Sequence, residues 1–167
     1  YATIALAKLI KQKQPRLFDY AFSLRSKHKV MDQLDFSKPS VVLHVSSKLP
    51  ASQGCATLVM PLVRHPSNPN AIIAVDLAKD AGSLLNNDPE TIRSRLYSKQ
   101  VDLGDEPRPG LKLIHINRSP FITTAKAMTE DTAARLGLDL EYCRQNFKQL
   151  AVADDLIARV EQVYNDA

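Results

Sequence analysis

The front of the chain carries apolar positions at helical spacing. The opening helix is predicted to stop near Gln14, because Pro15 disfavours a helical conformation in the residue before it. Its apolar side chains cover nearly the whole circumference, and they are Tyr1, Ala2, Ile4, Ala5, Leu6, Ala7, Leu9 and Ile10. A second helix is predicted from Pro15 into the low thirties, with an i, i+3, i+4, i+7 stripe made of Leu17, Tyr20, Ala21, Leu24, His28 and Met31.

From residue 41 the period of the apolar positions changes to two, which is typical of strands. Strands are predicted over residues 41–46, 57–64, 70–78 and 111–118. Pro61 lies inside the second of these and has no N–H to donate to a ladder, so it indicates an edge position or a bulge.

Helices are predicted again in the second half of the chain. Asp88 and Pro89 are an N-cap and a first helical residue, and Thr129 starts a short helix that Gly137 ends. Asp139 opens a further helix, and residues 153–164 form the last one. Runs of strands with helices before, between and after them predict an α+β fold, and four or five short strands are enough for a small β-barrel.

The opening helix also bears on domain organisation. A helix that is apolar all round must be buried on several sides, and the chain begins inside it without an initiator Met. We therefore expect a piece of a larger protein, with any activity belonging partly to the missing portion.

Composition places the chain among ordinary globular proteins. Its 167 residues can form one domain with its own core, and no apolar run approaches the roughly 20 residues needed to cross a bilayer. A secretory leader is not expected either, since no cationic region precedes the apolar start. Cys55 and Cys143 have neither metal-ligand nor redox spacing, which favours reduced thiols in the cytoplasm.

Charge is distributed unevenly along the chain. Residues 1–40 carry a net charge of +5 and residues 129–167 a net charge of −4. A basic front indicates a polyanionic partner, although scattered solvated charge would account for the same numbers equally well.

Catalytic motifs are nearly absent from the sequence. It has no Gly-rich phosphate loop, no HExxH, no GxSxG and no Cys/His metal set. The histidines lie on different predicted elements, which favours core or strand roles over a metal site, and they are His28, His44, His65 and His115. We expect neither a catalytic residue nor a bound metal within this chain.

A basic cluster runs from Arg25 to Lys29 and indicates a binding site more clearly than any residue indicates a catalytic one. Cations at this density suit contact with phosphates. On one continuous helix Arg25 and Lys29 would share a face. Near the end of the fourth strand, His115 and Asn117 alternate with Lys112, so they could reach sugar, phosphate or base edges. Each residue taken singly is more simply a solvated surface residue. Aromatic residues are few, which favours contact with the nucleic-acid backbone over base stacking.

Several long strings in the sequence resemble the bacterial exodeoxyribonuclease I family. They span residues 1 to about 120, with fainter similarity to about 150, and they are YATIALAKLI, QPRLFDYAFSLRSKHK, VVLHVSS, NAIIAVDLAKD, RLYSKQVDLGD and KLIHINRSP. The resemblance implies an SH3-like barrel of about five strands flanked by helices. Residues 1–14 would be the terminal helix of a missing exonuclease domain, and 15–167 an SH3-like domain with helices leading to a missing helical domain.

The resemblance further implies an activity for the full-length protein. Such an enzyme hydrolyses single-stranded DNA from its 3′ end with Mg²⁺ held by carboxylates, while this chain would be inactive alone and help to enclose the strand. The positions that resemble the family's DNA-facing residues are Lys27, Asn70, Lys112 and Asn117, and we add their neighbours Arg25, His28 and Tyr97.

The family also binds the acidic, apolar tail of single-stranded-DNA-binding protein. Tyr20 matches one aromatic residue of that pocket, and Lys38 is a further candidate for holding the tail. This chain departs from the family pattern at a few positions, which are Thr124, Thr129 and Ala151 in place of Gln and Arg, and Leu58 in place of Trp.

Two functional hypotheses follow. The first is a module that contacts the backbone of single-stranded DNA within a nuclease. The alternative is a module that chiefly docks the acidic tail of single-stranded-DNA-binding protein. A free-standing nucleic-acid binder is disfavoured by the scarcity of stacking aromatics, and we expect a monomer with no membrane contact.

Overall fold

The computed structural model describes residues 2–34, 36, 38–46, 49 and 55–165. The strands are β1 (Val42–Val45), β2 (Ala56–Arg64), β3 (Ala71–Asp76), β4 (Leu111–His115) and β5 (Phe121–Thr124). The helices are α1 (Ala2–Lys13), α2 (Pro15–Ser23), α3 (Lys27–Gln33), α4 (Gly82–Leu85), α5 (Pro89–Tyr97), α6 (Gln100–Leu103), the 3₁₀ turn η2 (Ala125–Ala127), α7 (Glu130–Leu136), α8 (Leu140–Ala151) and α9 (Leu156–Tyr164).

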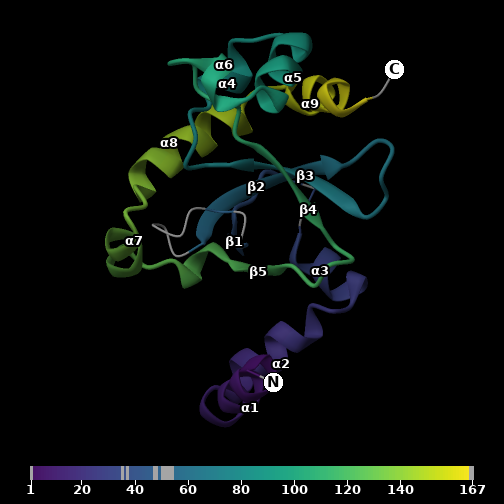
Figure 1. Ribbon diagram of the computed structural model, residues 1–167. Helices are drawn as coiled ribbons and strands as arrows, with labels where there is room; N and C mark the ends of the chain where they lie inside the picture. The colour runs from purple at the N-terminus through teal and green to yellow at the C-terminus, as the bar shows by residue number, and fades with distance from the viewer. Residues whose placement is uncertain (1, 35, 37, 47–48, 50–54, 166–167) are drawn as a thin grey trace.

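The five strands form one antiparallel sheet in the order β4-β3-β2-β1-β5 (Figure 1). The predicted α+β class and the number of strands are confirmed, but the barrel is not: among the described pairings none joins β4 to β5, and the sheet is open. On one face of this sheet, buried Leu24 after α2 and Val30 of α3 pack against the strands. The fifth strand, β5, was not predicted from the sequence.

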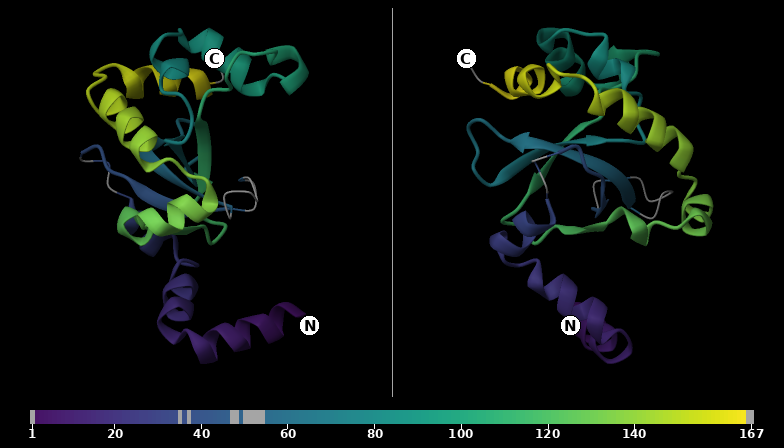
Figure 2. Two further views of the ribbon diagram at one scale, coloured as in Figure 1. Left: turned by 90° about the vertical axis from the view of Figure 1, so that its left-hand side faces the viewer. Right: turned by 180° about the vertical axis from the view of Figure 1, so that it is seen from behind.

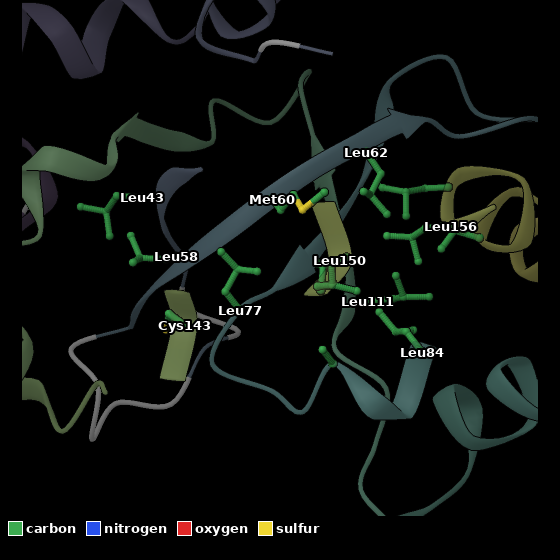
Figure 3. Close-up of a cluster of buried hydrophobic side chains, with 14 of the residues drawn as sticks. Leu43, Leu58, Met60, Leu62, Leu77, Leu84, Leu111, Cys143, Leu150 and Leu156 are labelled. Atoms are coloured by element: carbon green, nitrogen blue, oxygen red, sulfur yellow. The ribbon is translucent and has the colours of Figure 1, made fainter. Parts of the chain in front are cut away.

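Both faces of the sheet are buried, because neighbouring residues of its central strands serve different cores. Leu58 and Met60 of β2 belong to one apolar cluster, and Val59 between them belongs to the other. Helices α8 and α9 cover the first cluster with Leu150 and Leu156 (Figure 3). Leu24, which follows α2, and Val30 of α3 cover the second cluster, and Tyr20 and Met31 pack against it.

The region predicted as one long second helix is two helices. Helix α2 ends at Ser23 and α3 begins at Lys27, with Leu24 through Ser26 between them. Leu24, Val30 and Leu34 are all buried, and a change of direction after α2 lets the three side chains reach the same sheet face. Helices α1 and α2 project away from the sheet (Figure 2).

Capping and chain-breaking residues predicted several element boundaries correctly. Asp88 caps α5 by accepting a hydrogen bond from Thr91 N at 2.7 Å, and Gly137 ends α7 in the left-handed conformation at φ 71°. Helix α1 ends at Lys13, one residue before Gln14. The register of β2 against β3 shifts between Pro61 and Val63, so Pro61 marks a bulge in a central strand.

Asn146 of α8 is a buried polar residue that joins this helix to the end of β3. Its Nδ2 donates to Leu77 O and to Lys79 O at 2.9 Å each, and its Oδ1 accepts from Ala81 N at 3.3 Å. A buried side chain with three such partners fixes the position of the β3–α4 connection.

Replacing Asn146 by Ala should lower the free energy of unfolding by about 3 kcal/mol, because three buried backbone groups lose their partner. Urea unfolding measures the change. Gln145→Ala, an exposed neighbour on the same helix, is the matched control. Equal unfolding midpoints for the two variants would contradict the structural role of Asn146.

His44 is a second buried polar residue, and it lies on β1. Its Nδ1 is 3.2 Å from Phe121 O, a geometry that suits a neutral ring with the proton on Nδ1. Burial, and secondarily the charge of Lys112, lowers the pKa of His44 from 6.5 to about 4.

Because the folded-state pKa of His44 lies below its unfolded value, its contribution to stability is present above pH 6.5 and is lost as the pH falls towards 4. The loss should reach about 3 kcal/mol, and His44→Gln should remove this part of the pH dependence. Urea unfolding at several pH values checks it. Parallel profiles for the wild type and His44→Gln would refute the assignment.

Candidate nucleic-acid interface

A cavity of about 420 Å³ lies along the edge strand β4, next to the C-terminal end of α5. Tyr97 from α5 and Lys112 from β4, both predicted site residues, line this cavity together. His115, Lys79 and Arg108 contribute further polar side chains. The cavity therefore combines cationic groups with a phenol ring that is 68% exposed.

Lys112 lies in β4 and lines the cavity. It pairs with Ala74 of β3 and is half-buried, with Leu111 and Ile114 buried on either side along the strand. Its charge also contributes, after burial, to lowering the pKa of His44. The strand thus fixes the backbone from which this cation reaches the cavity.

Asn70 and Asn117 are also brought together, at the far end of β4. Ile116 N donates to Asn70 O at 2.9 Å, so the β2–β3 loop lies directly against the residues that follow β4. Asn70 is half-buried and Asn117 is exposed. Both amides can donate and accept hydrogen bonds, which suits contact with phosphate or base edges.

The basic cluster at the front does not lie on one helix. Arg25 falls in the break between α2 and α3, and its guanidinium stacks over the Phe22 ring at 3.8 Å. The expectation that Arg25 and Lys29 share a helical face is therefore wrong. Lys27 and His28 open α3 and are exposed, and His28 Nε2 lies 3.7 Å from Asp32 Oδ2.

Strand β4 connects these groups in space. It runs from the α4–α6 helices at one end to the turn beside α3 at the other (Figure 1). The cavity and the two asparagines thus lie along one strand, and α3 lies near its far end. Such a strip offers cations, amides and the rings of Tyr97 and Tyr164, and among the described residues it includes no group of side chains placed to hold a metal ion.

The two residues predicted to hold an acidic tail lie in different places. Tyr20 donates its hydroxyl proton to Ile122 O and packs edge-on against Phe121 at 5.9 Å, so it joins α2 to β5. Lys38 is exposed and borders an apolar cavity of about 200 Å³, together with Ala151 and Met60. Tyr20 does not line that cavity. Thr124 and Thr129 lie elsewhere, at the end of β5 and at the N-cap of α7.

Sequence reasoning missed Lys79 and Arg108 as parts of the interface. Both are in connections between elements, and their positions carry no periodic signal. Gly110 is the one sequence feature related to the position of Lys79, because a Cβ at Gly110 would lie 2.7 Å from the Cβ of Lys79. The glycine allows the Lys79 segment and the start of β4 to approach each other.

The described residues contain no cluster of three or more His, Cys, Asp or Glu side chains placed to hold a metal ion. Burial raises the pKa of the Cys143 thiol to about 11, so this thiol stays protonated near neutral pH and is a poor nucleophile. Across the described part of the chain, no helix has the length and apolar character needed to span a membrane.

Comparison with known proteins gives a consistent result. The Exonuclease I SH3-like domain family matches residues 25–166. Exodeoxyribonuclease I of Escherichia coli (strain K12) is 42% identical over the whole chain, which covers 35% of that relative. A structure of E. coli Exonuclease I in complex with a 5cy-dT13 oligonucleotide has a TM-score of 0.96 at 42% identity, covering all of this chain and 36% of that one.

An ExoI/SSB-Ct complex superposes almost as well, with a TM-score of 0.93 at 41% identity over all of this chain and 36% of that chain. The present chain spans about a third of the length of the curated relatives it matches. The match over residues 25–166 includes every strand of the sheet and helices α3 to α9. The chain therefore belongs to the family of Exonuclease I SH3-like domains.

Proposed function

We propose that this chain is the SH3-like, single-stranded-DNA-contacting module of a 3′-to-5′ exodeoxyribonuclease in the cytoplasm. The observation that carries the proposal is the strip along β4, where Tyr97 and Lys112 share a cavity and Asn70 and Asn117 continue it. The similarity to an E. coli Exonuclease I structure in complex with an oligonucleotide supports this assignment. The strip would help to enclose the DNA and keep the enzyme on its strand.

The exposed apolar residues of α1 support a second part of the proposal. Ile4, Leu6 and Leu9 are 61%, 56% and 50% exposed, although their side chains are of the kind that helices usually bury. We assign residues 1–14 to the terminal helix of an exonuclease domain and residues 15–167 to the SH3-like domain and its appended helices. The missing domain would cover these side chains.

Hydrolysis itself would take place outside this chain. The described residues offer no set of carboxylates or other donors for a metal ion, so the Mg²⁺ expected for the full-length enzyme would be held by its exonuclease domain. The role of the present residues is to bind and orient the strand, and the isolated chain is proposed to be inactive.

Lys112→Ala and Lys27→Ala should each weaken binding of the full-length protein to single-stranded DNA and flatten its salt dependence. Each lost phosphate contact should reduce the slope of log K against log salt by about 0.7. A fluorescence titration in EDTA, which prevents hydrolysis, measures both quantities. Lys148→Ala, an exposed lysine of α8 on the opposite side of the sheet, is the control. Unchanged slopes for both test variants would reject the DNA-contacting function.

A second candidate function is docking of the acidic, apolar tail of single-stranded-DNA-binding protein. The cavity beside Lys38 favours it, because apolar side chains such as Leu62 and Ile157 form its walls while a lysine stands exposed at its border. The similarity to an ExoI/SSB-Ct complex supports the same idea.

Reversing the charge at this cavity tests the docking function. Lys38→Glu should weaken binding of a tail peptide about tenfold, because an attraction becomes a repulsion, while DNA affinity stays at the wild-type value. Calorimetric titration of the peptide into the full-length protein checks it, with Lys126→Glu on η2 as control. Equal peptide affinity for the two variants would place the tail elsewhere.

A further inference from the structure

The C-terminal end of α5 is held by one arginine from a distant part of the loop. Arg108 Nη1 donates to Leu96 O at 2.6 Å and to Arg95 O at 3.3 Å, and its Nη2 donates to Ser98 O at 2.7 Å. The last carbonyls of a helix have no partner within the helix. A guanidinium satisfies several of them at once because its donors form a rigid planar fork.

Tyr97 lies between two residues whose carbonyls accept hydrogen bonds from Arg108. Two of the carbonyls bound by Arg108 belong to Leu96 and Ser98, its immediate neighbours in sequence. The Tyr97 side chain is 68% exposed and lines the cavity beside β4. Since little else holds so exposed a ring, its position depends on the backbone to which it is attached.

The segment that carries Arg108 is itself anchored. Pro109 and Gly110 are buried, and Gly110 O accepts a hydrogen bond from Asp76 N at 2.6 Å, which fixes the start of β4 against the end of β3. A second tie joins α5 to the loop, since Arg95 Nη1 lies 3.5 Å from Glu106 Oε2. Arg108 therefore holds the end of α5 in a fixed position relative to the edge of the sheet.

We propose that Arg108 is a positioning residue that holds Tyr97 at the cavity so that its ring can stack on one nucleobase of the bound strand. This inference rests on the proposed DNA-contacting function. Arg108 already donates three hydrogen bonds to carbonyls through its two terminal nitrogens, which is the geometry of a residue that holds the backbone of α5. Stacking on an aromatic ring accepts any base, which suits an enzyme that moves along a strand regardless of sequence.

The test compares DNA affinity and its salt dependence in the full-length protein, with oligo-dT in EDTA. Tyr97→Ala should weaken binding about tenfold. Arg108→Lys keeps the charge but loses the fork, and should weaken binding about fivefold without changing the salt slope. In the Tyr97→Ala background Arg108→Lys should have no further effect. Additive losses in the double variant would overturn the positioning role.

Two outcomes would point to a different role for Arg108. If Arg108→Lys binds like the wild type while Arg108→Ala lowers the salt slope by about 0.7, the residue contacts a phosphate and the proposal fails. The matched control is Arg159→Lys, because Arg159 donates to Leu85 O and Asn87 O at the end of α4 and does not line the cavity. If Arg159→Lys loses as much affinity as Arg108→Lys, the loss in both variants comes from general destabilisation of the fold and the positioning role is rejected.

The same measurements separate this inference from the function on which it rests. If Tyr97→Ala and Lys112→Ala both bind DNA like the wild type, the DNA-contacting function fails. If those two variants bind weakly and Arg108→Lys does not, the function stands and only the positioning role is lost.

Discussion

The burial of both faces of one short sheet governs the rest of this structure. Residues of β2 and β3 alternate between two apolar clusters, so Ile72 and Ile73 are both inaccessible although they point to opposite sides. Helices α8 and α9 must then cover one face, and the end of α2 with α3 must cover the other. What remains of the sheet itself for binding is its edge, its strand ends and the loops around them. The candidate interface lies along that edge for this reason.

Local chemistry in the sequence predicted much of this fold, because caps and breakers act on their immediate neighbours. Asp88, Pro61 and Gly137 each have the effect that their residue type suggests. Features that depend on packing between residues distant in the sequence were harder to predict. The break after Ser23 arises because buried side chains on both sides of it serve the same sheet face. Strand β5 was missed because four residues are too few for an alternation of apolar and polar positions to stand out, although its residue types suit a strand.

The candidate site shows the same division. Lys112 and Tyr97 could be proposed from the sequence, and the structure brings them to one cavity. That Asn70 lies against the end of β4 follows from a hairpin loop whose path the sequence does not specify. The sequence alone gives no indication of the roles of Arg108 and Asn146, since an arginine in a Gly- and Pro-rich loop and an asparagine in a helix are both ordinary. Both are significant only through the distant carbonyls that they bind.

The position of β4 at the edge of the sheet has a consequence for the behaviour of the protein in solution. In the described pairings β4 has a single neighbour, β3, so it is an edge strand, the kind of strand to which a strand from another molecule can add. A lysine in such a strand opposes this pairing, because joining two copies would desolvate its charge. Lys112 is placed to do so. One side chain would thus keep the edge closed to other proteins while leaving it open to a polyanion.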